Sequence, residues 1–293
     1  MITEKEIMNL RIGVVANDAG GSNYIYSFIK NHSISPFLYC NGPAKDIFSK
    51  LENSVVCLSI DEVISNVDII IFATGQTSGF EIENLKYSKN KVLTASVLDH
   101  WTNYTNRFKF NNESILPDTF IVFDKEAYDL STSQFPEFKN IILLKNYYLE
   151  NQLIESNTLE IKKDYILYID EPIKFHPTSI KKYNYDEISG LELFLKSKNK
   201  TRFKNDKIVI RFHPSELNKS KYDVLINSYK GISIANNNSL VEDLIKSKIV
   251  VGYESMAMIV ALELNKPVFS IIPPKGTKSS LPFDQIKSFF DEV

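Results

Sequence analysis

Short runs of apolar, often β-branched residues alternate along this chain with segments in which apolar residues recur every three or four positions. The first pattern is typical of strands buried on both faces of a sheet, and the second is typical of helices packed on one side. In the first half it predicts strands at 11–16, 37–40, 55–58, 67–73, 91–98, 119–123 and 140–144, and helices at 23–30, 44–51 and 61–65. This alternation favours parallel βαβ units.

The alternation weakens between 150 and 163, where charged residues become more frequent, and it starts again at Tyr165. The second half is predicted to hold strands at 165–169, 207–212, 232–235, 249–251 and 268–272, and helices at 188–196, 222–228, 240–245, 256–264 and 283–290. We therefore predict an α/β protein with two Rossmann-like, doubly wound parallel-sheet domains, 1–155 and 156–293, that face each other across a cleft. One large doubly wound sheet is the alternative.

The composition excludes several classes of protein. The 293 residues carry a formal net charge of −2, and Lys and Arg are scattered, so an extended nucleic-acid-binding surface is not expected. The first ten residues do not resemble a secretory leader, and no apolar run reaches the roughly 20 residues that span a bilayer. We expect a cytoplasmic protein, with peripheral association at the inner face of the membrane left open. Cys40 and Cys57 form no Cys-x-x-Cys pair and are predicted to be small buried hydrophobes.

Two predicted strands of the second half end in polar residues that suit a phosphate. Strand 207–212 runs into His213 and Pro214, and the proline holds the histidine in a rigid turn. An imidazole there can hydrogen-bond a phosphate or protonate a departing one. A purely structural histidine in a turn is the alternative.

The second of these strands, 249–251, is followed by Gly252, Tyr253, Glu254 and Ser255 and then by a predicted helix. The glycine would let the backbone approach a ligand, and Ser255 would stand where a helix N-terminus presents unpaired N–H groups and a partial positive charge. Glu254 could accept hydrogen bonds from ribose hydroxyls. A plain N-cap role for Ser255 is the alternative, and both roles can hold at once.

These two motifs resemble the His-Pro and Ser/Thr motifs of bacterial sialyltransferases and polysialyltransferases, which have the GT-B fold. His213 and Ser255 are 42 positions apart, a plausible separation for that family. The resemblance covers about 165–272 and implies a CMP-linked donor whose phosphate is held by His213 and Ser255, without a metal or other cofactor. The family's acidic motif, Asp/Glu-Asp/Glu-Gly, is matched by Asp170-Glu171-Pro172, where proline replaces glycine. By this match Asp170 would deprotonate the acceptor hydroxyl.

The first half offers a polar loop after its first predicted strand. Asp18 stands there with Gly20, Gly21 and Ser22, in a pattern that differs from Gly-x-Gly-x-x-Gly. Acceptor binding and general base catalysis are the functional interpretations of Asp18. The alternative is a turn whose glycines only allow tight packing of strand and helix.

Two further loops of the first half follow predicted strands. Asp99 and His100 precede the only tryptophan, Trp101, and Arg107 follows a few positions later. These groups suit a sugar acceptor: Arg107 could hold a carboxylate, and an Asp–His pair could act as a base. A buried tryptophan with a satisfied Asp–His loop is the alternative. Thr74 and Gly75 begin the other candidate loop, which runs to 79.

The sequence thus leads to the hypothesis of a metal-independent, inverting glycosyltransferase. It would move a nonulosonic, sialic-acid-like sugar from a CMP donor to a glycan or glycolipid acceptor in surface-polysaccharide biosynthesis. A UDP-sugar 2-epimerase or a glycerophosphate transferase of the same fold is the first alternative, and a non-catalytic glycan-binding partner is the second.

Overall fold

A computed structural model describes residues 3–75, 79–160, 163–173, 185–214, 216–236, 238–274 and 279–292. The chain folds into two compact units, Met1–Asn151 and Gln152–Val293. The sequence pattern places the boundary between 155 and 156. A helix, α8 (Tyr147–Ser156), occupies the region where the sequence pattern weakens, and none of its residues is buried.

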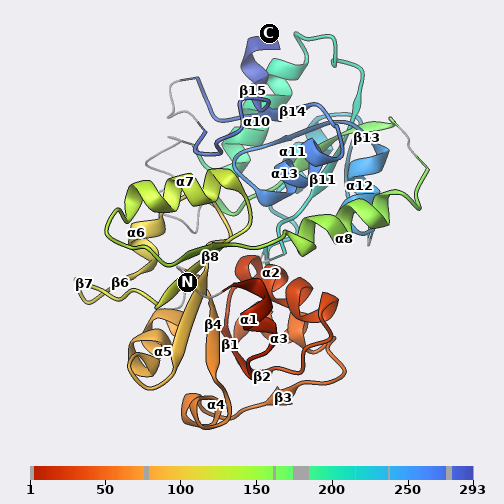
Figure 1. Ribbon diagram of the computed structural model, residues 1–293. Helices are drawn as coiled ribbons and strands as arrows, with labels where there is room; N and C mark the ends of the chain where they lie inside the picture. Colours follow the sequence, from red (N-terminus) through yellow and green to blue (C-terminus); the bar gives the residue numbers. More distant parts are fainter. Residues whose placement is uncertain are drawn as a thin grey trace. The chain divides into compact units, whose positions relative to one another are not determined.

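The first unit is built on a parallel seven-stranded sheet (Figure 1). Its strands, in spatial order, are β3 (Val55–Val56), β2 (Phe37–Cys40), β1 (Ile12–Ala16), β4 (Ile69–Ala73), β5 (Leu93–Val97), β8 (Thr119–Val122) and β9 (Ile141–Leu143). Every residue of β1 and β4 is buried, as expected for central parallel strands with a layer on each face. A small antiparallel hairpin, β6 (Lys109–Phe110) and β7 (Glu113–Ser114), lies outside this sheet and was not predicted.

Helices cover both faces of this sheet. The chain runs from β1 outward to β3, then returns to β4 and proceeds in the opposite direction, so right-handed crossovers place helices on opposite faces. Consistent with this, α2 packs against α3, whereas α4 packs against α5. The helices are α1 (Glu4–Met8), α2 (Ala19–Asn31), α3 (Gly42–Phe48), α4 (Ile60–Asn66), α5 (Phe80–Ser88), α6 (Tyr104–Arg107) and α7 (Lys125–Gln134). The direction of winding reverses between β1 and β4, where doubly wound sheets bind their ligands.

The second unit repeats this plan with a six-stranded parallel sheet. Its spatial order is β12 (Ile232–Ile234), β11 (Lys207–Arg211), β10 (Tyr165–Ile169), β13 (Ser247–Gly252), β14 (Val268–Ser270) and β15 (Lys287–Ser288). Winding reverses between β10 and β13. The helices are α10 (Glu187–Lys198), α11 (Asp223–Ser228), α12 (Leu240–Lys246) and α13 (Met256–Glu263).

The predicted helix over 283–290 is wrong. Lys287 and Ser288 instead pair with β14, and a 3₁₀ turn, Phe289–Glu292, follows. Phe289 is fully buried, with its ring 4.8 Å from that of Phe194 and 5.9 Å from that of Phe269. Tertiary packing of this aromatic side chain therefore overrides the local helical pattern.

Among the described residues, no helix combines the length and apolarity that crossing a membrane requires.

We predict that Gly190→Ala destabilises the second unit. Alanine at an ordinary helix position stabilises relative to glycine by roughly 0.5–1 kcal/mol. A Cβ on Gly190 in α10 would instead lie 1.5 Å from Oη and 2.8 Å from Cζ of buried Tyr253. We expect a net loss of about 1–3 kcal/mol, measured by denaturant unfolding. The double variant with Tyr253→Phe should recover part of that loss, and unchanged stability of the single variant would contradict this packing.

Candidate functional site

The loop after β1 places Asp18 at the reversal point of the first sheet. Asp18 is the N-cap residue of α2 but makes no side-chain capping bond, and its Oδ1 accepts a hydrogen bond from the Asn17 side chain at 2.9 Å. Ser22 Oγ donates back to the Asp18 carbonyl at 2.5 Å, so Ser22 fixes the loop from within α2. The carboxylate is thus held at the strand edge by its own loop.

Two glycines leave room for two carboxylates at this edge. A Cβ on Gly20 would lie 1.9 Å from Asp99 Oδ2, and a Cβ on Gly75 would lie 2.1 Å from Asp18 Oδ2. Gly21 has a different role, because its Cβ would lie 3.1 Å from the Ala73 backbone where α2 packs on β4. The packing interpretation of this loop therefore applies to Gly21, whereas Gly20 and Gly75 bring the loops after β1, β4 and β5 together.

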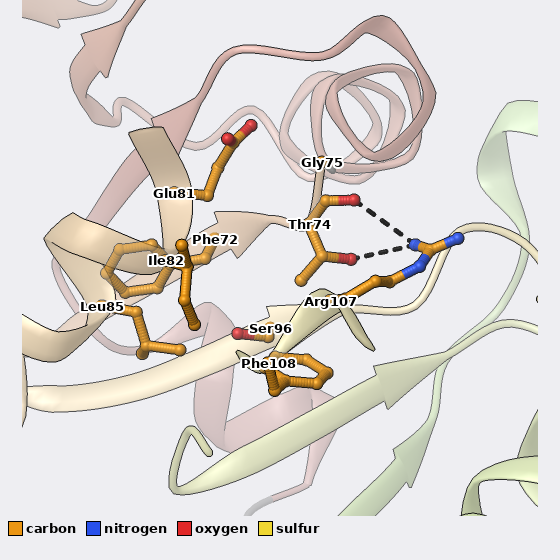
Figure 2. A pocket seen from close by; sticks show the side chains of 9 residues that line it. All are labelled: Phe72, Thr74, Gly75, Glu81, Ile82, Leu85, Ser96, Arg107 and Phe108. Atoms are coloured by element: carbon orange, nitrogen blue, oxygen red, sulfur yellow. Dashed lines mark hydrogen bonds between the residues drawn. The ribbon is translucent and has the colours of Figure 1, made fainter. Parts of the chain in front are cut away.

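Arg107 at the end of α6 ties two of these loops to each other, and Figure 2 shows its hydrogen bonds to Thr74 in one of them. Its Nη1 donates to Asp99 Oδ1 at 2.5 Å, to Thr74 Oγ1 at 3.1 Å and to the Thr74 carbonyl at 3.3 Å. The guanidinium is 7% exposed, and its Nε has no hydrogen-bond partner among the described residues. Asp99 already neutralises the charge of Arg107. This ion pair argues against the predicted role of Arg107 in holding a substrate carboxylate.

Glu81 belongs to this site although the sequence interpretation missed it. It lies in the first turn of α5, is 3% exposed, and its Oε1 accepts hydrogen bonds from the backbone N–H groups of Asn17 (2.8 Å) and Asp18 (3.3 Å). Burial, and secondly the nearby Asp18 carboxylate, raise the pKa of Glu81 to about 7. An acidic residue in a first helical turn is usually a surface group, so only the position of Glu81 after β4 could have indicated that it belongs to the site.

A small pocket opens beside Glu81 and Arg107 (Figure 2). Its cavity volume is about 10 Å³, close to the space that one water molecule needs. Ser96 Oγ and Arg107 Nε line it without a partner among the described residues. The pocket therefore suits one small polar group. The full lining is Phe72, Thr74, Gly75, Glu81, Ile82, Leu85, Ser96, Arg107 and Phe108. Positions 76–78 of the predicted loop lie outside the described residues.

The residues after Asp99 divide into a packing residue and a half-buried histidine. Trp101 is 5% exposed and its Nε1 donates to Asp124 Oδ1 at 3.0 Å, while the same Asp124 oxygen caps α7. Trp101 is thus buried, as one part of the buried-tryptophan alternative has it. His100 Nδ1 lies 3.2 Å from Thr102 Oγ1, and His100 remains at the strand edge.

In the second unit, His213 is half-buried two residues after β11. Its carbonyl accepts a hydrogen bond from the Glu216 N–H at 2.9 Å, and Pro214 is exposed. β11 pairs with β10, and the Asp170 N–H donates to the Arg211 carbonyl at 2.9 Å. His213 therefore lies at the same sheet edge as the end of β10.

Ser255 follows β13, on the other side of β10. It is the N-cap of the eight-residue helix α13, and its Oγ accepts a hydrogen bond from Ala257 N–H at 3.2 Å. The Glu254 N–H donates to Glu171 Oε2 at 2.8 Å, and the Glu254 carboxylate accepts bonds from both the N–H and the hydroxyl of Ser280. Glu171 and Glu254 thus shape the turn that presents the helix N-terminus.

Gly252 and Tyr253 are core residues, contrary to their predicted role in ligand binding. Tyr253 is fully buried, and its ring packs against Gly190. A Cβ on Gly252 would lie 3.1 Å from Met258 Sδ and 3.3 Å from Ile169 Cβ. The missing side chain of Gly252 therefore lets α13 approach β10 and β13.

The burial of Asp170 argues against its predicted role as the base. Asp170 is fully buried, with Lys221 Nζ at 2.9 Å from Oδ2, and the Tyr222 hydroxyl donates to Oδ1 at 2.5 Å. A general base must come within hydrogen-bond reach of the acceptor hydroxyl. A carboxylate enclosed by these two partners is placed to organise the loop, whereas the partly exposed Asp18 and Asp99 lie at a strand edge.

Comparison with protein-family models and with curated proteins finds no match. Among solved structures, UDP-GlcNAc 2-epimerase from Neisseria meningitidis bound to UDP-GlcNAc matches with a TM-score of 0.61 and 14% identity, over 89% of this chain and 82% of that one. The S. aureus MnaA–UDP structure matches with a TM-score of 0.58 and 12% identity, over 89% of this chain and 78% of that one. The glycotransferase of kitacinnamycin matches with a TM-score of 0.51 and 7% identity, over 89% of this chain and 80% of that one. These likenesses confirm the predicted fold of two parallel-sheet α/β domains of the GT-B kind, and none of the three is a sialyltransferase.

We predict that Glu81→Gln removes a pH-dependent loss of stability. Below the ordinary Glu pKa of 4.5 the carboxyl is neutral in both folded and unfolded chains. As the pH rises to about 7, the unfolded chain loses this proton first, so the buried carboxyl increasingly disfavours folding. Above that pH the variant should be relatively more stable by up to about 3 kcal/mol. Melting temperatures from pH 4 to 8 test this, with exposed Glu83→Gln as the control. Parallel curves for wild type and Glu81→Gln would contradict it.

Proposed function

We propose that this chain is a glycosyltransferase that acts on a nucleotide sugar without a metal ion. One observation carries the proposal: His213 and Ser255 follow β11 and β13, the two neighbours of β10, at the edge where the second sheet reverses its winding. Ligands of doubly wound sheets bind at such a point. The second unit would hold the nucleotide, and the first unit would hold the acceptor.

The chemistry expected of the second unit is stabilisation of a leaving phosphate. The dipole of α13 places a partial positive charge at its N-terminus, where the Ala257 N–H donates to Ser255 Oγ at 3.2 Å and the Met258 N–H donates to the Ser255 carbonyl at 3.0 Å. His213 would hydrogen-bond the phosphate as the bond to the anomeric carbon breaks, and it would donate a proton where the leaving group needs one. Together these groups could neutralise the developing charge without a cation.

The donor that the sequence motifs favour is a CMP-linked nonulosonic acid. The resemblance to bacterial sialyltransferases rests on His213, Pro214 and Ser255. The likeness to a UDP-GlcNAc 2-epimerase bound to UDP-GlcNAc, and to the MnaA–UDP structure, supports a second candidate, a UDP-sugar 2-epimerase. The nucleobase of the bound nucleotide, cytosine or uracil, separates the two candidates.

The charges of the first unit favour a neutral sugar as the acceptor. Arg107 is balanced by Asp99, and the carboxylate of Asp18 lies in the same region of the strand edge. An acidic group brought there would meet more negative than positive charge. The same oxygen atoms readily accept hydrogen bonds from sugar hydroxyls, and Asp18 is our choice for the general base.

We predict that one class of nucleotide stabilises the protein strongly. At a concentration of about 100 times Kd, a ligand adds about 2.7 kcal/mol to the free energy of unfolding. Thermal unfolding with CMP, UDP, GMP and AMP at equal concentrations gives the measurement, and CMP should produce the largest shift. A larger shift with UDP would support the epimerase instead. If no nucleotide shifts the melting temperature, the proposed function is wrong.

We predict three different results for three aspartates. Asp18→Asn should abolish turnover and spare nucleotide binding, because the proposed base is lost. Asp99→Asn should raise the acceptor KM, because it releases Arg107. Asp170→Asn should lower the melting temperature, because it breaks a buried ion pair. Near wild-type turnover in Asp18→Asn would exclude it as the base, and full stability of Asp170→Asn would contradict its structural role.

A further inference from the structure

A buried cluster of charges lies below the His213 loop. Lys221 Nζ is 2.5 Å from Glu216 Oε2, 2.9 Å from Asp170 Oδ2 and 3.6 Å from Glu187 Oε1. All four side chains are at most 4% exposed. We call these four residues the Lys221 cluster. Three carboxylates therefore lie within 3.6 Å of one ammonium group, away from water.

Such a cluster is a costly way to obtain stability alone. Taking charges out of water carries a large penalty, and well-packed apolar residues often replace a buried ion pair without loss. What distinguishes this cluster is the set of elements that it joins. Asp170 follows β10, Glu187 begins α10, and Glu216 lies in the loop after β11, three residues beyond His213.

The contacts of the cluster reach both sides of His213. On one side, the Glu216 N–H donates to the His213 carbonyl at 2.9 Å, and the Glu216 carboxylate is held by Lys221. On the other side, the ring of Phe212 stacks on that of Tyr222, with centroids 5.8 Å apart and an angle of 11° between the planes. The hydroxyl of Tyr222 donates to Asp170 Oδ1 at 2.5 Å. The residue before His213 and its own carbonyl are thus both connected to Lys221.

We propose that Lys221 is the positioning residue for His213. It acts by fixing the loop that carries the histidine to the end of β10 through Glu216 and Asp170. Lys221 itself does not meet the ligand, because its side chain is 4% exposed. The proposal rests on the proposed function only in assigning His213 a ligand to meet. A shift of about 1 Å in a group that contacts the reacting atoms can lower a rate by roughly 10²-fold.

The cluster provides a matched pair of substitutions. Glu216→Gln and Glu187→Gln each neutralise one carboxylate of the same lysine, but only Glu216 belongs to the His213 loop. If the cluster only stabilises the fold, the two glutamine variants should have similar effects on His213. Positioning predicts that Glu216→Gln alone alters His213. Lys221→Met is the direct variant. Its control is Lys266→Met, a second buried lysine, whose Nζ donates to the carbonyls of Ile245 (2.8 Å) and Ser247 (3.0 Å).

The first measurement is the NMR spectrum of the imidazole groups in the protein without ligand. The chain has four histidines, and the His213 signal is assigned by its loss in His213→Ala. We expect Lys221→Met and Glu216→Gln to shift or broaden this signal, and Glu187→Gln and Lys266→Met to leave it in place while lowering the melting temperature. If Lys221→Met does not fold, the comparison of Glu216→Gln with Glu187→Gln still tests whether the cluster positions His213. An unmoved His213 signal in Glu216→Gln, or equal movement in both glutamine variants, would overturn the proposal.

The second measurement is the affinity for CMP and UDP by calorimetry. The nucleotide that binds the wild type should bind Lys221→Met and Glu216→Gln at least about tenfold more weakly, and the two control variants within about twofold. Equal affinity in all folded variants would contradict positioning for phosphate. If neither nucleotide binds the wild type, the proposed function fails, whereas the NMR comparison still decides whether Lys221 positions His213.

Discussion

Burial of the central strands on both faces is the constraint on which the rest of this structure depends. β1 and β4 are buried along their whole length, and β10 and β13 nearly so. Unpaired polar groups are costly in such an interior, so the polar chemistry collects where the strands end. Since all strands in each sheet are parallel, those ends share one edge, and the reversal of winding leaves that edge uncovered by a crossover.

Each unit fixes its edge with a charged group that is itself buried. In the first unit the Glu81 carboxylate accepts two backbone N–H groups of the loop after β1. In the second unit the ammonium group of Lys221 holds the loop after β11 to the end of β10. Lys221 is not placed to touch a ligand, whereas Glu81 also lines the small pocket of the first unit. Both offset the cost of their burial by giving an otherwise irregular loop one defined conformation, as a binding site requires.

The two edges differ in charge, and this difference suggests a division of labour. The second unit presents the positive end of α13 and a histidine, which suit a phosphate. The first unit presents Asp18 and Asp99 against a single, already paired Arg107. Such an edge suits the hydroxyl groups of a neutral sugar and a base to activate one of them.

The sequence by itself determined the βαβ architecture, the two-unit organisation and the strand ends at which polar residues gather, because these depend on local periodicity and on short motifs. It could not determine which of those polar residues stay at the edge. Tyr253 and Asp170 turn inward to partners far along the chain, Gly190 and Lys221, and no local pattern reports such contacts. Glu81 and Lys221 were missed for the same reason, since each looks like a surface charge until its loop is placed above it. Only the tertiary structure decided burial, and burial separates a reactive group at the strand edge from a supporting group below it.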